Sequence, residues 1–211
     1  EAAAQKTALE AGDIDLAMDL GADQIVGMES NPNLTIFSGL RETVIFLIFN
    51  QDAAIGGPVA DARVQKAIRL ALDYEGIKAL GGDGAETPPS LLPLGFPAAW
   101  PADRAPVRDL EGAQALLAEA GFVTGFTIDL ESPDTTLVGV NFGTFAQKVQ
   151  ADLAEVGITV NLAPAALQPA LERYRNGQAP FGLWLWNPDF IDVADRLSFL
   201  PEGKVGLRAN W

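Results

Sequence analysis

Two carboxylates lie close together near the end of the chain. Asp189 and Asp192 are three residues apart and follow an apolar stretch, residues 181–186. A carboxylate pair could exchange protons with a substrate or hold a hard cation. Aspartate is also preferred in turns and at the start of helices, which gives the pair a structural interpretation. Hydrolysis would need a second, remote acid, and the sequence does not place one.

Aromatic side chains gather around the same stretch. Trp184 and Trp186 are two residues apart and would point to the same face of a strand, with Phe181 and Phe190 nearby. Aromatic residues supply much of the packed area in protein cores, so a place in the core is one interpretation. Two tryptophans beside acidic residues at a strand end could instead form one wall of a ligand cleft. The sequence leaves both interpretations open.

The composition excludes several other chemistries. The 211 residues include no His and no Cys, which rules out triads and metal sites built on them, haem ligation through His, and disulfides. With 14 basic and 28 acidic residues, the formal charge of −14 disfavours nucleic acid as a partner. The segment Gly81-Gly82-Asp83-Gly84 lacks the spacing of a phosphate-binding loop. We therefore expect neither a metal ion nor a cofactor.

The elements that would position these residues alternate between helix and strand from residue 107 onward. Hydrophobic spacing and capping residues predict helices over 109–120, 141–156 and 166–176, and strands over 126–131, 158–162 and 181–186. An apolar content of 48% is typical of a globular protein. This order predicts an α/β fold in which helices pack on a sheet.

The first hundred residues follow a less regular pattern. We expect helices over 2–10, 61–72 and 74–80, a helical turn over 22–29, and strands over 14–18 and 34–38. Residues 43–49 form an apolar run that is typical of a strand buried on both faces. Residues 81–106 hold many Gly and Pro residues, so we expect a functional loop or a strap that covers the fold.

The sequence shows no membrane span, because no stretch approaches about 18 uninterrupted apolar residues. The chain opens with Glu1 instead of an initiator Met and ends at Trp211 without an evident stop signal. We therefore expect a segment of a longer protein. The absence of a signal peptide then says nothing about its destination.

Four stretches, in this order and spacing, resemble one family. They are residues 8–17, Phe49-Asn50 followed by residues 61–73, residues 113–122 and residues 149–160. Together they resemble the family 5 extracellular solute-binding proteins, the peptide- and nickel-binding components of bacterial ABC importers. The resemblance covers nearly the whole chain and depends on four stretches in register instead of a single motif.

The resemblance implies a place for the chain within a larger fold. It implies one lobe of a two-lobed periplasmic-binding-protein fold, built as an α/β mixed sheet with packed helices. Residues 1–43 would be the end of a first-lobe segment and residues 44–190 the second lobe. Residues 191–211 would begin the return to the first lobe.

Residues 186–192, Trp-Asn-Pro-Asp-Phe-Ile-Asp, resemble the family's Trp-x-x-Asp-Tyr-x-Asp segment. In peptide-binding members the first Asp holds the ligand's α-ammonium group, and the resemblance gives this role to Asp189. A desolvated carboxylate in a closed cleft is well suited to an ammonium with three donors. Trp186 would line the ligand pocket, and Asn187 and Phe190 would complete the set. Phe190 stands where Tyr is usual and removes a hydroxyl group, which leaves the ligand class open.

We therefore expect a solute-binding protein that is not an enzyme. It would capture a small solute, foremost a peptide, by hinge closure between two lobes and deliver it to an ABC permease in the membrane. We expect a periplasmic or extracytoplasmic location, a monomer, and no nucleic-acid partner. Two alternatives stay open. A carboxylate-based hydrolase such as a glycosidase would need a second acid about 5–9 Å from the first, and a structural domain would have no ligand.

Overall fold

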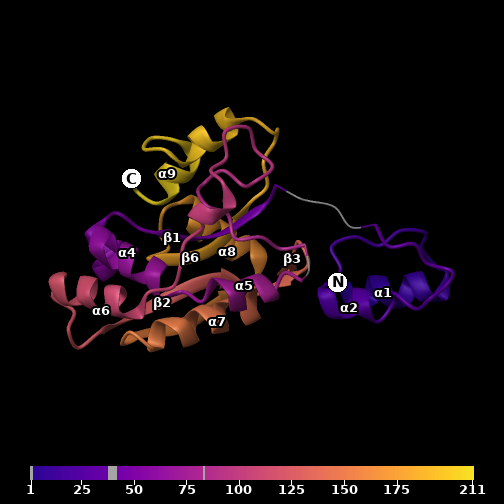
Figure 1. Ribbon diagram of the computed structural model, residues 1–211, viewed down its shortest axis with the longest axis horizontal. Helices are drawn as coiled ribbons and strands as arrows, with labels where there is room; N and C mark the ends of the chain where they lie inside the picture. The colour runs from indigo at the N-terminus through magenta and orange to yellow at the C-terminus, as the bar shows by residue number, and fades with distance from the viewer. Residues whose placement is uncertain (1, 38–41, 83) are drawn as a thin grey trace.

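The two ends of the chain occupy separate places in the computed structural model (Figure 1). The structure describes residues 2–37, 42–82 and 84–211. Residues from 42 onward form a body around a four-stranded sheet, and the N-terminal segment, residues 2–37, lies to one side of it. This segment contains α1 (Ala2–Ala11) and α2 (Ala22–Val26).

The sheet of the body is mixed. Its strands are β1 (Val44–Phe49), β2 (Phe126–Pro133), β5 (Ile158–Ala165) and β6 (Phe181–Trp186), in the spatial order β1-β6-β2-β5. Strand β2 is parallel to β5 and β6, whereas β1 is antiparallel to β6. A separate hairpin follows β2 and consists of β3 (Thr136–Leu137) and β4 (Val140–Asn141). The predicted α/β fold with a mixed sheet is confirmed.

Helices cover both faces of the sheet. One face packs against α4 (Ala62–Ala71), α6 (Leu110–Glu119) and α7 (Phe142–Ala154), and the other against α8 (Leu167–Arg175) and α9 (Lys204–Arg208). Leu183 of β6 enters the first core and Trp184 enters the second, because successive side chains of a strand point to opposite faces. Trp186 packs on the same side as Trp184, as predicted.

Polar side chains begin four of these helices. Asp61, Asp73, Asp109 and Asn141 each accept a hydrogen bond from a backbone N–H at the start of α4, α5 (Tyr74–Ala79), α6 and α7. Each bond satisfies an amide that the helix itself leaves unpaired. The caps predicted at Asp61 and Asp109 are confirmed. No helix within the described ranges is long and apolar enough to cross a membrane.

The Gly- and Pro-rich stretch forms an irregular strap over the body. Among its described residues, the only helix or strand is the short helix η2 (Ala102–Arg104). Two other short helices, α3 (Ala53–Gly56) and η1 (Gly57–Ala60), precede α4. Phe96 of the strap is only 4% exposed. The strap therefore covers part of the body, which confirms the expectation for the described residues of 81–106; Asp83 lies outside them.

Two predicted strands are absent. Residues 14–18 and 34–37 have no strand conformation, and Ser38 lies outside the described residues. The Gln5 side chain donates a hydrogen bond to the Met18 carbonyl oxygen and accepts one from the Met18 N–H, both at 3.1 Å. A side chain thus satisfies the backbone that a neighbouring strand would have paired. The prediction was wrong because alternation of apolar residues does not supply a partner strand.

Strand β1 lies at the edge of the sheet, so the prediction of burial on both faces was wrong. In the described chain it pairs with β6 alone, and only Ile48 of its six residues is fully buried. Its apolar sequence has a different cause. Leu47 and Phe49 pack against the first core while Phe46 and Ile48 contribute to the second, so both faces are half-buried.

The C-terminal residues pack on the same sheet as the rest of the body. They form η3 (Val193–Phe199) and α9. The Gln51 N–H donates to the Ala209 carbonyl oxygen at 2.7 Å, and the Asn210 side chain donates to Asn50 Oδ1 at 2.9 Å. The divisions expected after residues 43 and 190 stay predictions.

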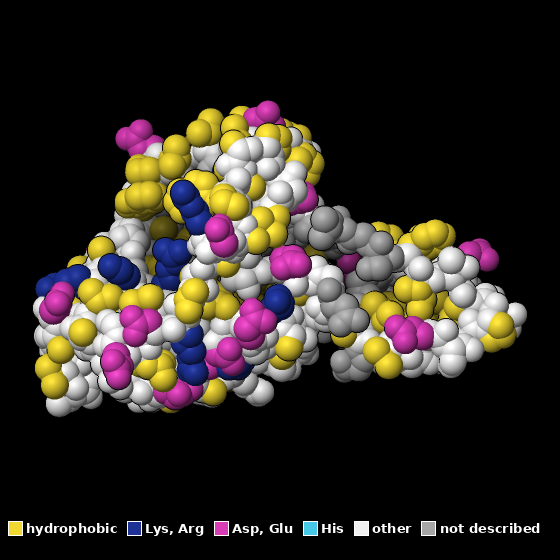
Figure 2. All heavy atoms as spheres, viewed as in Figure 1, with side chains coloured by type: hydrophobic (Ala, Val, Ile, Leu, Met, Phe, Trp, Pro, Cys, Tyr) yellow, Lys and Arg dark blue, Asp and Glu magenta, His cyan; other side chains and the backbone are white. Residues whose placement is uncertain are grey.

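The N-terminal segment exposes apolar side chains (Figure 2). Phe37 is 90% exposed, and Leu16 and Val26 are also largely exposed. Among its described residues Met28 is the one buried hydrophobic side chain. This part of the segment therefore has no core of its own.

Candidate ligand-binding site

The candidate site lies where the strands of the body end. The parallel strands β2, β5 and β6 have their carboxyl ends at one edge of the sheet, and ligands of open α/β sheets bind at this edge. Antiparallel β1 begins there, because Val44 lies opposite Trp186. The chain therefore enters the body beside the loop that follows β6, residues 187–192.

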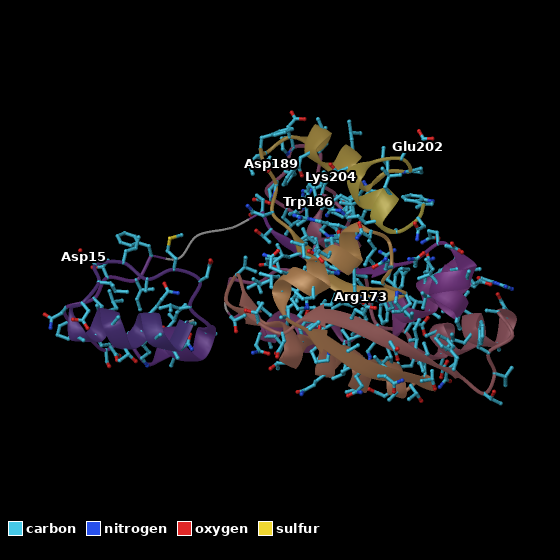
Figure 3. The ribbon with its side chains drawn as sticks, turned by 180° about the vertical axis from the view of Figure 1, so that it is seen from behind. Asp15, Arg173, Trp186, Asp189, Glu202 and Lys204 are labelled. Atoms are coloured by element: carbon cyan, nitrogen blue, oxygen red, sulfur yellow. The ribbon has the colours of Figure 1, made fainter. Side chains whose placement is uncertain are left out.

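Asp189 is exposed on this loop, at the margin of the body and above Trp186 in the view of Figure 3. Its backbone N–H donates a hydrogen bond to Asp195 Oδ1 at 3.1 Å. Its carboxylate has no hydrogen bond or ion pair with any described residue. Phe190 beside it is 54% exposed. The backbone is thus held in place while the charged group is free to meet a ligand.

Trp186 is half-buried at the end of β6. Its indole Nε1 donates to Asp195 Oδ2 at 2.7 Å, and its ring meets Phe199 edge-on with centroids 5.4 Å apart. The Lys204 ammonium lies 5.8 Å from the ring centroid. In contrast, Trp184 is buried and stacks on Tyr174 at 4.5 Å. Trp184 is therefore a core residue, and Trp186 is the tryptophan that reaches the edge.

Asp195 and Arg196 are central to this arrangement and were missed by the sequence reasoning. The two residues are only 5% and 4% exposed, although both carry charge. Arg196 Nε lies 3.7 Å from Asp195 Oδ2, and its guanidinium covers the Phe96 ring at 4.7 Å. Burial lowers the pKa of Arg196. The available signal was an Asp-Arg pair inside an otherwise apolar stretch, residues 193–200.

Two further contacts join the site to the chain entering β1. The Thr43 hydroxyl donates to Asn187 Oδ1 at 2.7 Å, and Arg196 Nη2 donates to the Glu42 carbonyl oxygen at 3.1 Å. Asn187 is exposed on the loop, as Asp189 is. The loop is therefore tied both to the body and to the connection from the N-terminal segment.

Asp192 has a structural role. Its Oδ1 accepts a hydrogen bond from the Ala194 N–H at 2.8 Å and so caps η3. The two aspartates singled out by their spacing thus differ, because Asp192 is used locally and Asp189 is not. Within residues 2–37, 42–82 and 84–211, no three His, Cys, Asp or Glu side chains group in a way that could hold a metal ion.

Asp189 lies on an open edge and not inside a closed cavity. Two surface hollows lie elsewhere, one of about 200 Å³ between β1 and α9 and one of about 380 Å³ beside α6 and Gly157. Asp189 lines neither of them. Asp189 is thus a surface residue beyond the end of β6.

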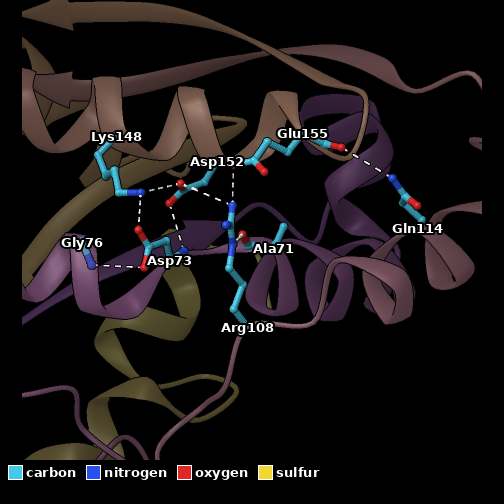
Figure 4. A network of polar contacts seen from close by, with 8 residues as sticks. All are labelled: Ala71, Asp73, Gly76, Arg108, Gln114, Lys148, Asp152 and Glu155. Carbon is cyan, nitrogen blue, oxygen red and sulfur yellow. Dashed lines mark hydrogen bonds and ion pairs between the residues drawn. The ribbon is translucent and has the colours of Figure 1, made fainter.

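A cluster of charges around the buried Asp152 lies among the helices (Figure 4). Asp152 of α7 is 1% exposed and accepts from Lys148 Nζ at 2.6 Å and from the Asp73 N–H at 3.0 Å. Arg108 Nη2 lies 3.7 Å from Asp152 and donates to Glu155 at 2.6 Å. These contacts hold α7 against the junction of α4 and α5 and make the cluster a structural one.

The charges of this cluster stabilise one another. The hydrogen bond from Lys148 lowers the pKa of Asp73. Burial acts to lower the pKa of Lys148, but its bonds to Asp152 and Asp73 outweigh burial and raise it. The bond to Glu155 raises the pKa of Arg108. All three groups are therefore held in their charged forms.

Sequence comparison assigns the chain to a family. Residues 1–204 match the family described as bacterial extracellular solute-binding proteins, family 5 Middle. A Haemophilus influenzae relative named heme-binding protein A is 27% identical, over 94% of this chain and 36% of its own length. An Escherichia coli relative named probable D,D-dipeptide-binding periplasmic protein is 28% identical, over 100% of this chain and 40% of its own. The chain belongs to the family 5 extracellular solute-binding proteins and spans less than half of these relatives.

Solved structures show the same fold. A dipeptide-binding protein from a Pseudoalteromonas species, in complex with Met-Leu, has a TM-score of 0.86 at 20% identity, covering 99% of this chain and 41% of that one. A Helicobacter pylori periplasmic binding protein in complex with the peptide STSA has a TM-score of 0.80 at 21% identity, with the same coverages. The fold class is thus that of periplasmic binding proteins, and the coverage is consistent with one lobe.

Proposed function

We propose that this chain is part of a solute-binding protein that captures a peptide between two lobes. The chain would supply most of the second lobe, residues 44–190, and the protein would hand its ligand to an ABC permease without altering it. The names of its relatives are those of binding proteins and not of enzymes. We further propose that the protein works outside the cytoplasm as a monomer.

The observation that carries this proposal is the free carboxylate of Asp189 on a fixed backbone. It lies at the carboxyl edge of the sheet, beside half-buried Trp186 and exposed Phe190. A carboxylate of this kind suits the terminal ammonium of a peptide, which offers three donors. The neighbouring aromatic side chains would stack on apolar parts of the ligand.

The N-terminal segment supports the division into lobes. Its described residues expose Phe37, Leu16 and Val26 and contain one buried hydrophobic residue, Met28. Side chains of this size are normally covered when they cluster on a surface. We propose that the remainder of a first lobe covers them, so that residues 1–43 belong to that lobe.

The test uses the full-length protein and isothermal titration calorimetry. We expect unmodified di- and tripeptides to bind more tightly than the same peptides with an acetylated amino terminus. Asp189→Asn should weaken binding of the unmodified peptides by roughly 10- to 100-fold, because it removes a charged hydrogen-bond partner. Asp192→Asn, which alters an exposed cap, is the matched control. Equal affinity of Asp189→Asn and the wild type would remove Asp189 from the site.

A further inference from the structure

The structure assigns Asp195 the role of a positioning residue. Asp195 fixes Asp189 and Trp186 and thereby sets the preference of the site for a free amino group. This inference rests on the proposed function and names a residue that the sequence motif does not include. Asp195 is only 5% exposed, so it acts on the ligand through its neighbours and not by direct contact.

The two oxygens of Asp195 are used for two different partners. Oδ1 accepts from the Asp189 backbone N–H at 3.1 Å, and Oδ2 accepts from Trp186 Nε1 at 2.7 Å. One carboxylate thus fixes both the loop residue that carries the charge and the aromatic ring beside it. Because each donor meets a different oxygen, both positions of the side chain must be acceptors to keep the two bonds in this geometry.

Arg196 provides a positive charge for Asp195 without occupying those oxygens. Its Nε is 3.7 Å from Oδ2, beyond hydrogen-bond distance, and neither Nε nor Nη1 donates a hydrogen bond to any described residue. A nearby positive charge and hydrogen-bond donors offset the cost of removing a carboxylate from water. Asp195 has both, and its two oxygens accept from Trp186 and Asp189 instead of from Arg196.

The arrangement also determines which charge the ligand meets. Asp195 is buried, whereas the Asp189 carboxylate is exposed and without a partner among the described residues. A ligand therefore meets one carboxylate on a backbone whose direction is already set. Such preorganisation improves binding because less ordering is needed when the ligand arrives.

Asp195→Asn in the full-length protein tests the inference with little change in shape. An Asn amide has one acceptor oxygen, so its NH₂ group would face either the indole N–H or the Asp189 N–H. The probes are a library of unmodified di- and tripeptides and the same library with acetylated amino termini. We expect the affinity ratio of the two libraries to fall roughly tenfold in Asp195→Asn. We expect no change in Asp192→Asn.

The ratio separates positioning from general damage. Loss of folded protein would lower the apparent affinity for both libraries equally and leave the ratio unchanged. A wild-type ratio in folded Asp195→Asn would overturn the inference and leave the proposed function standing. If wild-type protein binds neither library, both the proposed function and this inference fall.

Two further measurements keep the test decisive. In the double variant Asp189→Asn/Asp195→Asn the ratio should fall no further than in Asp189→Asn alone, because Asp195 acts through Asp189. If Asp195→Asn does not fold, Trp186→Phe removes the indole donor and keeps a ring. We then expect a smaller fall in the ratio for Trp186→Phe. An additive loss when Trp186→Phe is combined with Asp189→Asn would contradict the inference.

Discussion

Asp152 and Asp195 are two buried aspartates with different surroundings. Asp152 accepts hydrogen bonds from Lys148 and from the Asp73 backbone N–H, and the Arg108 guanidinium lies 3.7 Å away. Asp195 accepts its hydrogen bonds from an indole and a loop amide, while Nε and Nη1 of the nearest cation, Arg196, donate no hydrogen bond to any described residue. Asp152 therefore joins helical segments of the body, whereas Asp195 orients the loop that carries Asp189.

The difference follows from where each aspartate lies. Asp152 lies in the last turn of α7, so its partners are Lys148 one turn earlier in the same helix, the Asp73 N–H at the start of α5 and Arg108 before α6. Asp195 lies in η3, directly beyond the carboxyl edge. We infer that the first cluster, around Asp152, maintains the fold and that the second, Asp195 with Arg196 and Trp186, holds the loop that carries Asp189.

The largest expected effect is on stability in the first cluster. Asp152→Asn should lower the free energy of unfolding by about 3 kcal/mol, because it removes the buried charge that the partly buried Lys148 and Arg108 face. Urea unfolding followed by circular dichroism measures this change. Asp129→Asn, an exposed carboxylate, is the control and should stay close to wild type. If Asp152→Asn lowered the free energy of unfolding no more than the control does, the proposed difference between Asp152 and Asp195 would be wrong.

The same substitution in the second cluster should cost less stability. Asp195→Asn should lower the free energy of unfolding by about 1–2 kcal/mol, since it gives up one of two neutral donors and no hydrogen bond from a cation. The same urea experiment, run in parallel, gives the comparison. Equal or greater loss than in Asp152→Asn would show that Asp195 also maintains the fold.

The smallest expected effect is a pH dependence that belongs to the first cluster. The bond from Lys148 lowers the pKa of Asp73 below its unfolded value, so the folded state binds this proton less readily. The resulting stability is complete above about pH 4 and is lost as the pH falls through the lowered pKa. Asp73→Asn, which keeps a capping oxygen for α5, should flatten the fall in unfolding free energy below about pH 4. An unchanged slope would show that Asp73 does not contribute.

Much of the body could be predicted from the sequence because its signals are local. Asp61 and Asp109 begin α4 and α6, and the apolar run of residues 181–186 forms β6. These features depend on backbone amides that need a cap and on side chains that must leave water. The place of Asp189 after β6 could be inferred in the same way, and its role stays a prediction.

Features that depend on distant partners could not be predicted. Residues 14–18 alternate as a strand does, but Gln5 satisfies the Met18 backbone instead. Residues 44–49 have the composition of a central strand and form an edge. In each case the missing information was which segment would lie alongside.

The sequence by itself determined the helices α6, α7 and α8 and the strands β2, β5 and β6, the family of the chain, and the motif that contains Trp186 and Asp189. Only the tertiary structure decided that Asp192 caps a helix while Asp195, three residues later, is buried beneath the loop. Spacing along the chain is the same for Asp189 to Asp192 and for Asp192 to Asp195. The difference arises because η3 turns one carboxylate toward solvent and the other toward Trp186, and only packing sets that direction.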